Sequence, residues 1–441
     1  MSAPSTQHST DHCDQPDSDA LPNRKGWCPG ALRPMQTGDG LLVRIKPRNN
    51  RMSCHNARQL ADLSRRYGNG IIDLTQRANL QIRGVTDTNL ESLVETLSHL
   101  GLLDESVAVE SVRNILVSPL AGIDPTAADL TALTAQLETA LRDTPSLHAL
   151  PGKFSFAVDA GGKLPLGPTT SDITLTAVPN TNLWDLEHAG STHPVCRIET
   201  RNAVGEIVKL AQEFLRQQSA TVRRMRDLAN TTLPNVNKIA AGTHVIGRLS
   251  LDEECELVAL GCAFGRITAD QLSQIATAAE NVDCSTLHLT PWHSIFIPCQ
   301  TSDTAAIILS TAKQVGLITE LTDARRSIAA CPGHPACRQG QTSAMADAET
   351  LSQIVNLEGN AFTPDLIHVS GCAKGCARQQ ASVITLIGNA GCYDLVINGN
   401  VGDQPSQTNI APANVGSVIH AVLDTNAQNK KSTTSGAQSI G

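Results

Sequence analysis

The chain has 441 residues, of which 41% are hydrophobic, and a formal net charge of −8 at pH 7. This length predicts roughly three domains with sizeable cores, which excludes a fibrous or globally disordered chain. The acidic balance provides no general attraction for nucleic acid or anionic membranes, so neither is expected as a partner, and an acidic ligand needs a local basic site.

The first residues are polar and show no basic start followed by an apolar run, so no secretory signal is expected. No stretch approaches the roughly 18 unbroken apolar residues of a membrane span. We therefore expect a soluble, cytoplasmic protein whose 13 cysteines are reduced thiols or metal ligands. Residues 1–25 and 426–441 are rich in small polar residues and are expected to be disordered tails.

Strand-like and helix-like segments alternate between these tails, which predicts an α+β protein. The first unit, of about sixty residues, comprises a strand, a helix, two strands and a helix. Its members are expected at residues 41–45, 53–68, 71–74, 80–85 and 90–100. A further helix, with leucines at helical spacing, is expected to begin at Asp124–Pro125.

The pattern of this unit recurs later in the chain. The segment from Leu42 matches the segment from Leu257, and Arg51–Met52–Ser53 corresponds to Arg266–Ile267–Thr268, each before a predicted helix. The constant offset of 215 residues predicts an internal duplication with pseudo-two-fold symmetry. Chance similarity between two amphipathic segments is the alternative.

The two copies differ in one strand-like stretch. In the first copy, polar residues at alternate positions are expected to share one face, whereas the matching positions of the second copy are largely apolar. The pattern thus predicts a cationic surface on the first copy alone. The duplicated scaffold is therefore expected to carry a single working site. The positions compared are Arg77, Asn79, Gln81 and Arg83 with Trp292, Ser294, Phe296 and Pro298.

Four cysteines near the C-terminus form the most specific motif. Cys331 and Cys337 lie in CPGHPAC, and Cys372 and Cys376 lie in GCAKGC. Two Gly-containing loops of this kind can present four thiolates to one 4Fe-4S cluster. Structural zinc sites more often use C-x2-C pairs, so zinc, or four unrelated thiols, is the weaker alternative.

Basic residues gather in the first half of the chain. Converging guanidinium and ammonium groups suit a ligand with several carboxylates, and a solvated charged face is the alternative. The positions are Arg44, Lys46, Arg48, Arg77, Arg83, Arg113 and Lys153.

Nucleotide-binding motifs are incomplete. The stretches that begin at Gly38 and Gly68 lack the third glycine of G-x-G-x-x-G, and there is no G-x-x-x-x-G-K. Electrons are therefore expected from an external electron-donor protein.

Taken together, these motifs resemble the sulfite and nitrite reductase superfamily. The resemblance rests on LTQRANLQIRG, VRNILVSPLAG, LPGKFSFAVD, CPGHPAC and SGCAKGC, together with the repeated unit. Within the superfamily, the opening GWCPGALRPMQTGDGLLVRI and the TPWH element are most similar to the precorrin-3B synthases of the aerobic cobalamin pathway.

The resemblance implies two ferredoxin-reductase-like half-domains plus hemoprotein-like α/β domains. The half-domains are expected at residues 26–103 and 236–305. The first α/β domain is expected at residues 104–235, and an iron-sulfur-binding α/β domain at residues 306–425.

The resemblance also implies an oxidoreductase. A precorrin-3B synthase is a monooxygenase that hydroxylates a meso carbon of precorrin-3A with O2 and closes a lactone from the ring-A acetate. A siroheme-dependent sulfite or nitrite reductase is the alternative, with siroheme as cofactor in that case alone. A non-catalytic iron-sulfur carrier is the third hypothesis.

Site residues follow from the matched motifs. The four cysteines match cluster ligands, and Cys376 matches the ligand that bridges cluster and siroheme iron. A mononuclear iron is a further candidate cofactor. Gly152 and Ser155 replace basic residues that are usual in the reductases. The substrate-binding candidates are Arg44, from the basic strand, and Arg77, Gln81, Arg113, Asn114 and Lys153, from the resemblance.

Overall fold

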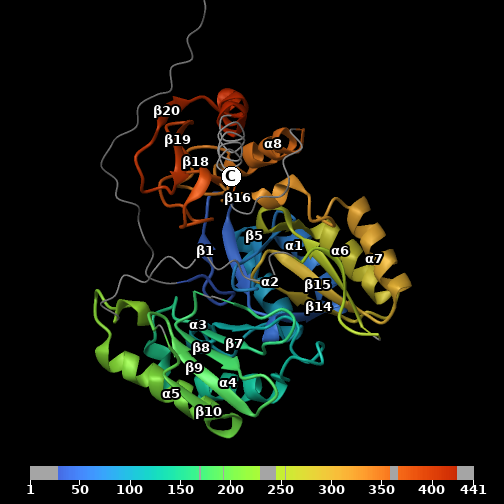
Figure 1. The fold of residues 1–441 in the computed structure, drawn as a ribbon, viewed down its shortest axis with the longest axis vertical. Coiled ribbons are helices and arrows are strands. Elements are labelled where there is room, and N and C mark those ends of the chain that lie inside the picture. Colours follow the sequence, from blue (N-terminus) through green and yellow to red (C-terminus); the bar gives the residue numbers. More distant parts are fainter. Residues whose placement is uncertain are drawn as a thin grey trace, which may run out of the picture. The chain divides into compact units, whose positions relative to one another are not determined.

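The computed structural model describes residues 28–167, 170–191, 193–228, 245–253, 255–357 and 366–424. The tails expected at residues 1–25 and 426–441 lie outside these ranges. The described chain forms two compact units that divide between Leu321 and Thr322 (Figure 1). No helix in the described ranges is both long enough and apolar enough to cross a membrane.

The first half-domain has the element order that the sequence predicts. Strand β2 (Leu41–Ile45) pairs with β5 (Leu80–Val85), and β5 pairs with β4 (Ile71–Leu74). Short β1 (Met35–Gln36) extends the sheet at its edge. The helices are α1 (Cys54–Tyr67) and α2 (Asp87–His99).

The second half-domain repeats this order, so the predicted duplication is confirmed. Its strands are β11 (Gly247–Ser250), β12 (Glu256–Gly261), β14 (Thr286–Leu289) and β15 (Ser294–Cys299). Its helices are α6 (Ala269–Glu280) and α7 (Ser302–Gln314).

The two copies agree in backbone detail. Left-handed residues occur at Asn49 and Phe264, with φ of 53° and 55°, and again at Ala78 and His293, with φ of 53° and 55°. Each pair is separated by the same 215 residues as the sequence repeat. Non-glycine residues adopt this conformation uncommonly, so its recurrence marks a conserved turn geometry within the chain itself.

The half-domains exchange one short strand each. Strand β3 (Arg51–Ser53) of the first copy pairs with β14 of the second, and β13 (Arg266–Thr268) of the second pairs with β4 of the first. The sheet orders are therefore β1-β2-β5-β4-β13 and β11-β12-β15-β14-β3. Helices α1 and α6, which follow the exchanged strands, pack against each other (Figure 1).

A third sheet lies in the same unit, with the order β10-β9-β8-β7-β6. Its strands are β6 (Ile115–Val117), β7 (Phe156–Asp159), β8 (Ile173–Ala177), β9 (Leu183–His188) and β10 (Cys196–Glu199). Helices α4 (Thr131–Asp143) and α5 (Thr200–Gln217) accompany it, and short α3 (Val107–Val112) precedes it.

Helix α4 begins later than predicted. The expected start at Asp124–Pro125 is wrong, because the Asp124 carboxylate accepts the backbone N–H and the hydroxyl of Thr126 at 2.9 and 2.7 Å. A side chain that bonds its own backbone two residues on forms a turn and competes with helix formation.

The second unit contains the fourth sheet, in the order β16-β17-β18-β19-β20. Its strands are β16 (Ile328–Ala330), β17 (Ile367–Ser370), β18 (Ser382–Asn389), β19 (Cys392–Gly399) and β20 (Gln407–Ile410). Helix α8 (Ala344–Leu357) connects β16 to β17, and residues 415–424 are helical.

This sheet has the topology of the third. In both sheets the first three strands in chain order are parallel to one another, and a helix connects the first strand to the second. The fourth strand then pairs antiparallel with the third, and the fifth pairs antiparallel with the fourth. The α/β part of the chain is therefore a second structural repeat, which supports the predicted fold class of half-domains plus α/β domains.

The exchanged strand β13 provides a test of this architecture. Ile267 in β13 is fully buried, at 0% exposure, within the joint core of the half-domains. We expect Ile267→Ala to lower the free energy of unfolding by about 2–5 kcal/mol, because truncation leaves a cavity in a packed core. Chemical denaturation followed by circular dichroism measures this change.

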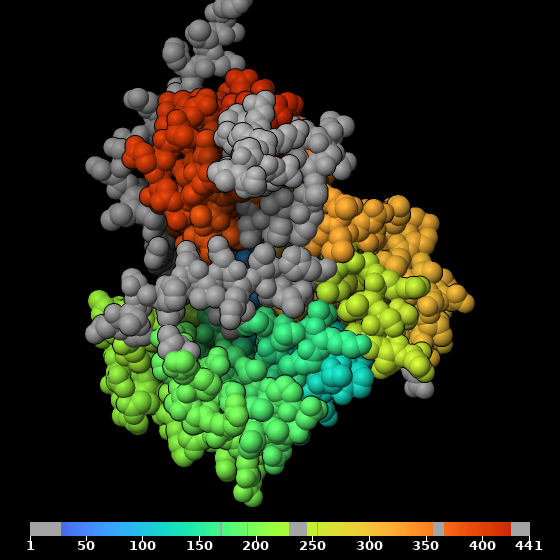
Figure 2. Space-filling model, viewed as in Figure 1, coloured from blue at the N-terminus to red at the C-terminus, as the bar shows by residue number. Residues whose placement is uncertain are grey.

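The matched control is Ile307→Ala. Ile307 is 49% exposed on α7, whose surface is orange in Figure 2. Its truncation is expected to change the free energy by less than about 0.5 kcal/mol. Equal effects of the two substitutions would contradict the role assigned to the exchanged strand.

Candidate functional site

The predicted cluster cysteines follow two neighbouring parallel strands. Cys331 comes directly after β16, and Cys372 comes two residues after β17. The pairing of β16 with β17 brings the carboxyl ends of the strands together, and the Cys331 N–H donates to the Val369 carbonyl at 3.2 Å. Strand order thus brings together two loops that are 34 residues apart in sequence.

Backbone hydrogen bonds tie these loops to each other. The Gly371 N–H donates to Cys331 Sγ at 3.1 Å, and the Gly371 carbonyl accepts from the Gln341 N–H at 2.7 Å. A Cβ at Gly371 would lie 3.0 Å from the Cα of Gly333 and 3.5 Å from Cys331 Sγ. Glycine is therefore needed for the close approach of the two loops.

All four thiols share one electrostatic environment. Burial, and then the thiols of Cys372 and Cys337, raises the pKa of Cys331. Partial burial, followed by the other three thiols, raises the pKa of Cys376, which is the most exposed residue of the set. Neighbouring thiolates repel one another, and this repulsion raises the pKa of each thiol. Binding of a cationic centre relieves the repulsion, and the thiols then release their protons.

The donor set fits an iron-sulfur cluster. It offers four thiols together with N–H donors to a ligand sulfur, a feature that tunes such clusters. Among the described residues, no three His, Cys, Asp or Glu side chains are arranged around one point to hold a single metal ion. The assignment of the four cysteines as cluster ligands stays a prediction.

The first α/β repeat shows the same backbone arrangement without cysteine. Ser118 follows β6 as Cys331 follows β16, and the Ala160 N–H donates to Ser118 Oγ at 2.8 Å, as the Gly371 N–H donates to Cys331 Sγ. The similarity of Val117-Ser118-Pro119 to Ala330-Cys331-Pro332 is the signal that sequence reasoning missed.

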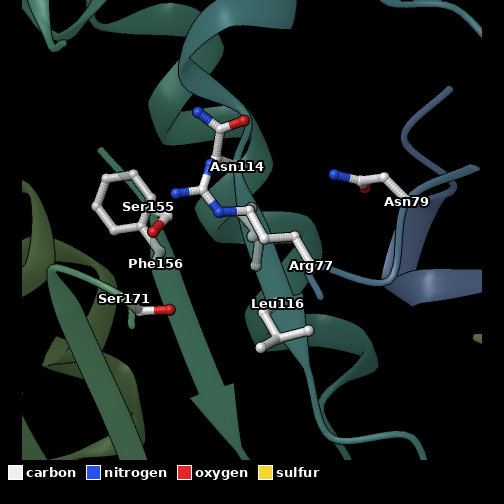
Figure 3. A pocket seen from close by; sticks show the side chains of 8 residues that line it. Arg77, Asn79, Asn114, Leu116, Ser155, Phe156 and Ser171 are labelled. Carbon is white, nitrogen blue, oxygen red and sulfur yellow. The ribbon is translucent and has the colours of Figure 1, made fainter. Parts of the chain in front are cut away.

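The basic residues belong to the other unit, where a shallow pocket opens beside Arg77 (Figure 3). Figure 3 shows the Arg77 side chain directed toward Asn114 and Ser155, with Asn79 on the opposite side. The space is about 210 Å³ including the part open to solvent, so it suits one peripheral group of a ligand and is too small for a macrocycle. Its lining comprises Arg77, Asn79, Asn114, Ile115, Leu116, Ser155, Phe156 and Ser171.

Arg77 and Arg44 lack a carboxylate partner among the described residues. Arg77 Nη2 donates to the Lys153 carbonyl at 2.8 Å, and Arg44 donates from Nε and Nη2 to Gln81 Oε1 at 3.0 and 2.7 Å. Burial lowers the pKa of both guanidinium groups. A half-buried guanidinium group that forms no ion pair keeps donors that suit an anionic ligand, so this pair is a candidate anion-binding site.

Cys28 lies against both guanidinium groups. Its side chain is hydrogen-bonded to Arg44 and to Arg77. The segment that carries it is held by Glu110, whose carboxylate accepts the N–H groups of Ala31 at 2.6 Å and Leu32 at 3.2 Å. The sequence analysis assigned Cys28 no role at this site.

Two predicted substrate-binding residues make contacts within the scaffold. Arg113 forms a bidentate ion pair with Asp104 at 2.6 and 2.9 Å, and it also donates to the Lys46 carbonyl at 2.8 Å. Asn114 accepts from Lys46 Nζ at 2.7 Å and donates to the Phe154 carbonyl at 3.0 Å. Both groups are buried and paired, and Asn114 also lines the pocket beside Arg77. The substrate-binding role of Arg113 and Asn114 stays a prediction.

The predicted strand face also needs correction. Arg77 and Asn79 precede β5, and the left-handed conformation of Ala78, with φ of 53°, interrupts the expected alternation. Arg83, within β5, forms ion pairs with Asp39 at 2.9 Å and with Asp73 at 3.0 Å. The cationic surface is therefore limited to Arg44 and Arg77, with the exposed Lys153 beside them.

The matching face of the second half-domain is packed. Phe296 is fully buried with Leu257 and Leu120, and its ring centroid lies 6.1 Å from that of Trp292. This stretch of the second copy is therefore core, which agrees with the expected single site.

Comparisons with known proteins bear on this arrangement. The nitrite/sulfite reductase ferredoxin-like half domain matches residues 33–100 and 253–310, which are the two half-domains described above. A precorrin-3B synthase from Sinorhizobium sp is 32% identical over 409 residues, covering 87% of this chain and 85% of the relative. The chain belongs to the precorrin-3B synthase family.

This family lies within the sulfite and nitrite reductase superfamily, as expected. The chloroplastic ferredoxin–nitrite reductase of Arabidopsis thaliana is 24% identical, covering 79% of this chain and 67% of the relative. The solved structure of the Mycobacterium tuberculosis NirA protein has a TM-score of 0.68 at 17% identity, over 86% of this chain and 79% of that one. The relatives are oxidoreductases, which confirms the expected enzyme class.

The glycine-rich packing around the cysteines yields a prediction. A Cβ at Gly388 would lie 2.6 Å from the Gly371 carbonyl oxygen, so Gly388→Ala must displace the cysteine loop. Ligand sets tolerate shifts of only about 0.5 Å, so we expect iron and labile sulfide to fall roughly twofold or more per chain. Chemical iron and sulfide assays on anaerobically purified protein measure this loss.

Gly205→Ala is the control for that substitution. Gly205 lies within α5, and a Cβ there meets nothing within 4 Å. Iron and sulfide content is expected to match the parent chain. Full cluster content in Gly388→Ala would contradict the proposed loop geometry.

The buried Lys46 predicts a pH dependence. Burial, and then the nearby Arg113, lowers the pKa of Lys46 to about 7, against the attraction of Glu110. The unfolded lysine has a pKa of about 10.4, so between these values the unfolded chain binds the extra proton, and the free energy of unfolding rises with pH.

Lys46→Met should remove this contribution. We expect the stability of the parent chain, relative to the variant, to rise from pH 7 to pH 10 by up to about 1.4 kcal/mol per pH unit. Denaturant titrations of both proteins across this range provide the comparison. Parallel stability profiles would show that Lys46 does not lose its proton in the folded protein.

Proposed function

We propose that the protein is a precorrin-3B synthase-type monooxygenase of aerobic cobalamin biosynthesis. The proposed reaction hydroxylates a meso carbon of precorrin-3A with O2 and forms the ring-A lactone. The observation that carries the proposal is the site with Arg44 and Arg77, two half-buried guanidinium groups that form no ion pair with a carboxylate among the described residues. The chain that carries them is 32% identical to a precorrin-3B synthase.

The substrate chemistry matches this site. Precorrin-3A carries acetate and propionate groups, and a guanidinium binds a carboxylate through two parallel hydrogen bonds. Ser155 Oγ is buried without a hydrogen-bond partner and lines the pocket beside Arg77, so it can donate to the same carboxylate. Lys153, whose carbonyl accepts from Arg77, is exposed and offers a further charge, and Gln81 orients Arg44.

The protein's own contribution is orientation. Carboxylates held by Arg77 and Arg44 determine which meso carbon is presented, and a fixed pose supplies much of the rate enhancement of such a step. One oxygen atom of O2 enters the product and the other leaves as water, with two electrons from an external donor protein and two protons. A 4Fe-4S cluster held by Cys331, Cys337, Cys372 and Cys376 would supply electrons one at a time.

A siroheme-dependent reductase is the second candidate, because nitrite and sulfite reductases are also relatives. The basic residues that these enzymes usually carry at two positions are Gly152 and Ser155 here, which favours a released substrate over a tightly held prosthetic group. The absorption spectrum of the purified protein distinguishes the two. Siroheme bands in the red would overturn the monooxygenase proposal.

Turnover provides the direct test. Incubation with precorrin-3A, O2 and a reductant should yield a product heavier by one oxygen atom, detected by mass spectrometry. With ¹⁸O2, the added oxygen should be labelled. An unchanged substrate in the presence of a full 4Fe-4S cluster would count against the proposal.

The guanidinium of Arg77 provides the substitution test. Removal of a charge-assisted hydrogen bond costs about 1.5–3 kcal/mol, so we expect Arg77→Ala to weaken precorrin-3A binding roughly 10- to 100-fold. Anaerobic titration followed by absorbance measures the dissociation constant, and iron and sulfide assays should show an unchanged cluster.

Arg201→Ala is the matched control, since Arg201 is 77% exposed on α5 and outside the pocket. Its affinity for precorrin-3A is expected to equal that of the parent chain. An Arg77→Ala protein with parental affinity and an unchanged denaturation midpoint would refute the assigned site.

A further inference from the structure

Four cysteines outside the predicted cluster gather at one end of the second half-domain sheet. Neighbouring strands in this sheet are antiparallel, so the start of one strand lies beside the end of the next. Cys255 precedes β12, Cys299 ends β15, Cys284 lies two residues before β14, and Cys54 follows β3. The exchange of β3 is what adds Cys54 to the group.

Two of these thiols are neighbours across the sheet. The register of β14 with β15 pairs His288 with Phe296, so its continuation sets Ser285 opposite Cys299, with Cys284 one residue away. The side chains of Cys284 and Cys299 accordingly act on each other's pKa. Cys54 instead donates from Sγ to the Cys284 carbonyl at 3.1 Å, so it contacts the backbone of the pair. Cys284 and Cys299 are therefore the pair that a bond between sulfur atoms can join.

The members of the group differ in acidity. The hydrogen bond from Cys299 lowers the pKa of Cys284 and raises that of Cys299. Burial raises the pKa of Cys54 to about 11 and also raises that of Cys255. The thiolate is the reactive form, so Cys284 has the character of an attacking thiol and Cys299 that of its resolving partner.

The pair lies just beneath the surface. Cys284 and Cys299 are 5% and 3% exposed, while their chain neighbours Asp283, Ser285 and Gln300 are exposed. The exposed neighbours place the buried pair close to solvent. This placement favours oxidation by a small molecule.

We propose that Cys284 and Cys299 form a redox-active dithiol that a hydroperoxide oxidises to a disulfide. The Cys284 thiolate attacks the peroxide oxygen, the O–O bond breaks, and the alcohol (or water, from hydrogen peroxide) leaves with a proton. The Cys299 thiol then attacks the sulfenic sulfur, the S–S bond forms, and water leaves. The two thiols lose two electrons and the peroxide gains them. The proposal does not depend on the proposed function.

Peptide mapping of the full chain tests the proposal. The segment 267–313 contains no internal Lys or Arg and carries Cys284 and Cys299 as its only cysteines, so trypsin releases both in one peptide. The anaerobic protein is treated with equimolar tert-butyl hydroperoxide, alkylated under denaturing conditions and digested. We expect this peptide to lose two hydrogens and to take no label, whereas the untreated peptide takes two labels.

Internal and variant controls make the result specific. Cys196 is more exposed and has no neighbouring thiol among the described residues, so its tryptic peptide 164–197 should remain fully alkylated. In Cys284→Ser, Cys299 should remain available to the label. Equal oxidation of Cys196 and the pair, a disulfide to Cys54 or Cys255, or a Cys284 sulfinic acid with Cys299 still reduced would each overturn the proposal.

Discussion

The reciprocal pairing of β3 with β14 and of β13 with β4 is the contact on which the larger unit depends. Each strand has only three residues, and a strand of that length gains little by itself. On the partner sheet, each strand covers an edge and buries one side chain, which is Met52 in β3 and Ile267 in β13. Each strand also leads into a helix, and these two helices, α1 and α6, pack against each other. Neither half-domain is therefore complete alone, and one joint core spans both copies.

This shared scaffold gives the two copies different tasks. In the first copy, the residues before β5 open onto a pocket with Arg77 and Asn79. In the second copy, the equivalent stretch buries Phe296 in a small apolar cluster. Duplication thus provides a stable frame, and the loss of charge from one copy allows that face to pack while the other stays available for a ligand.

The arginines show why charge alone does not identify a binding residue. Arg83 and Arg113 look equivalent to Arg44 and Arg77 in the sequence, yet each is neutralised by internal carboxylates. An ion pair of this kind holds the scaffold and leaves few donors for a ligand. Arg44 and Arg77 are half-buried, and their guanidinium groups contact Gln81 and a backbone carbonyl and form no ion pair with a carboxylate in the described part of the chain. That difference is why we propose them as the ligand-binding pair.

The sequence by itself determined the element order, the duplication and the two cysteine pairs, because helical and strand periodicity and short-range spacing are local properties. It also led to the family through motifs such as CPGHPAC. The strand exchange, the second repeat that relates Ser118 to Cys331, and the meeting of Cys284 with Cys299 were decided only by the tertiary structure. These three features depend on which distant strands become neighbours in the folded chain. The role of each arginine depends in the same way on whether a carboxylate from elsewhere in the chain pairs with it. Local sequence spacing encodes neither property.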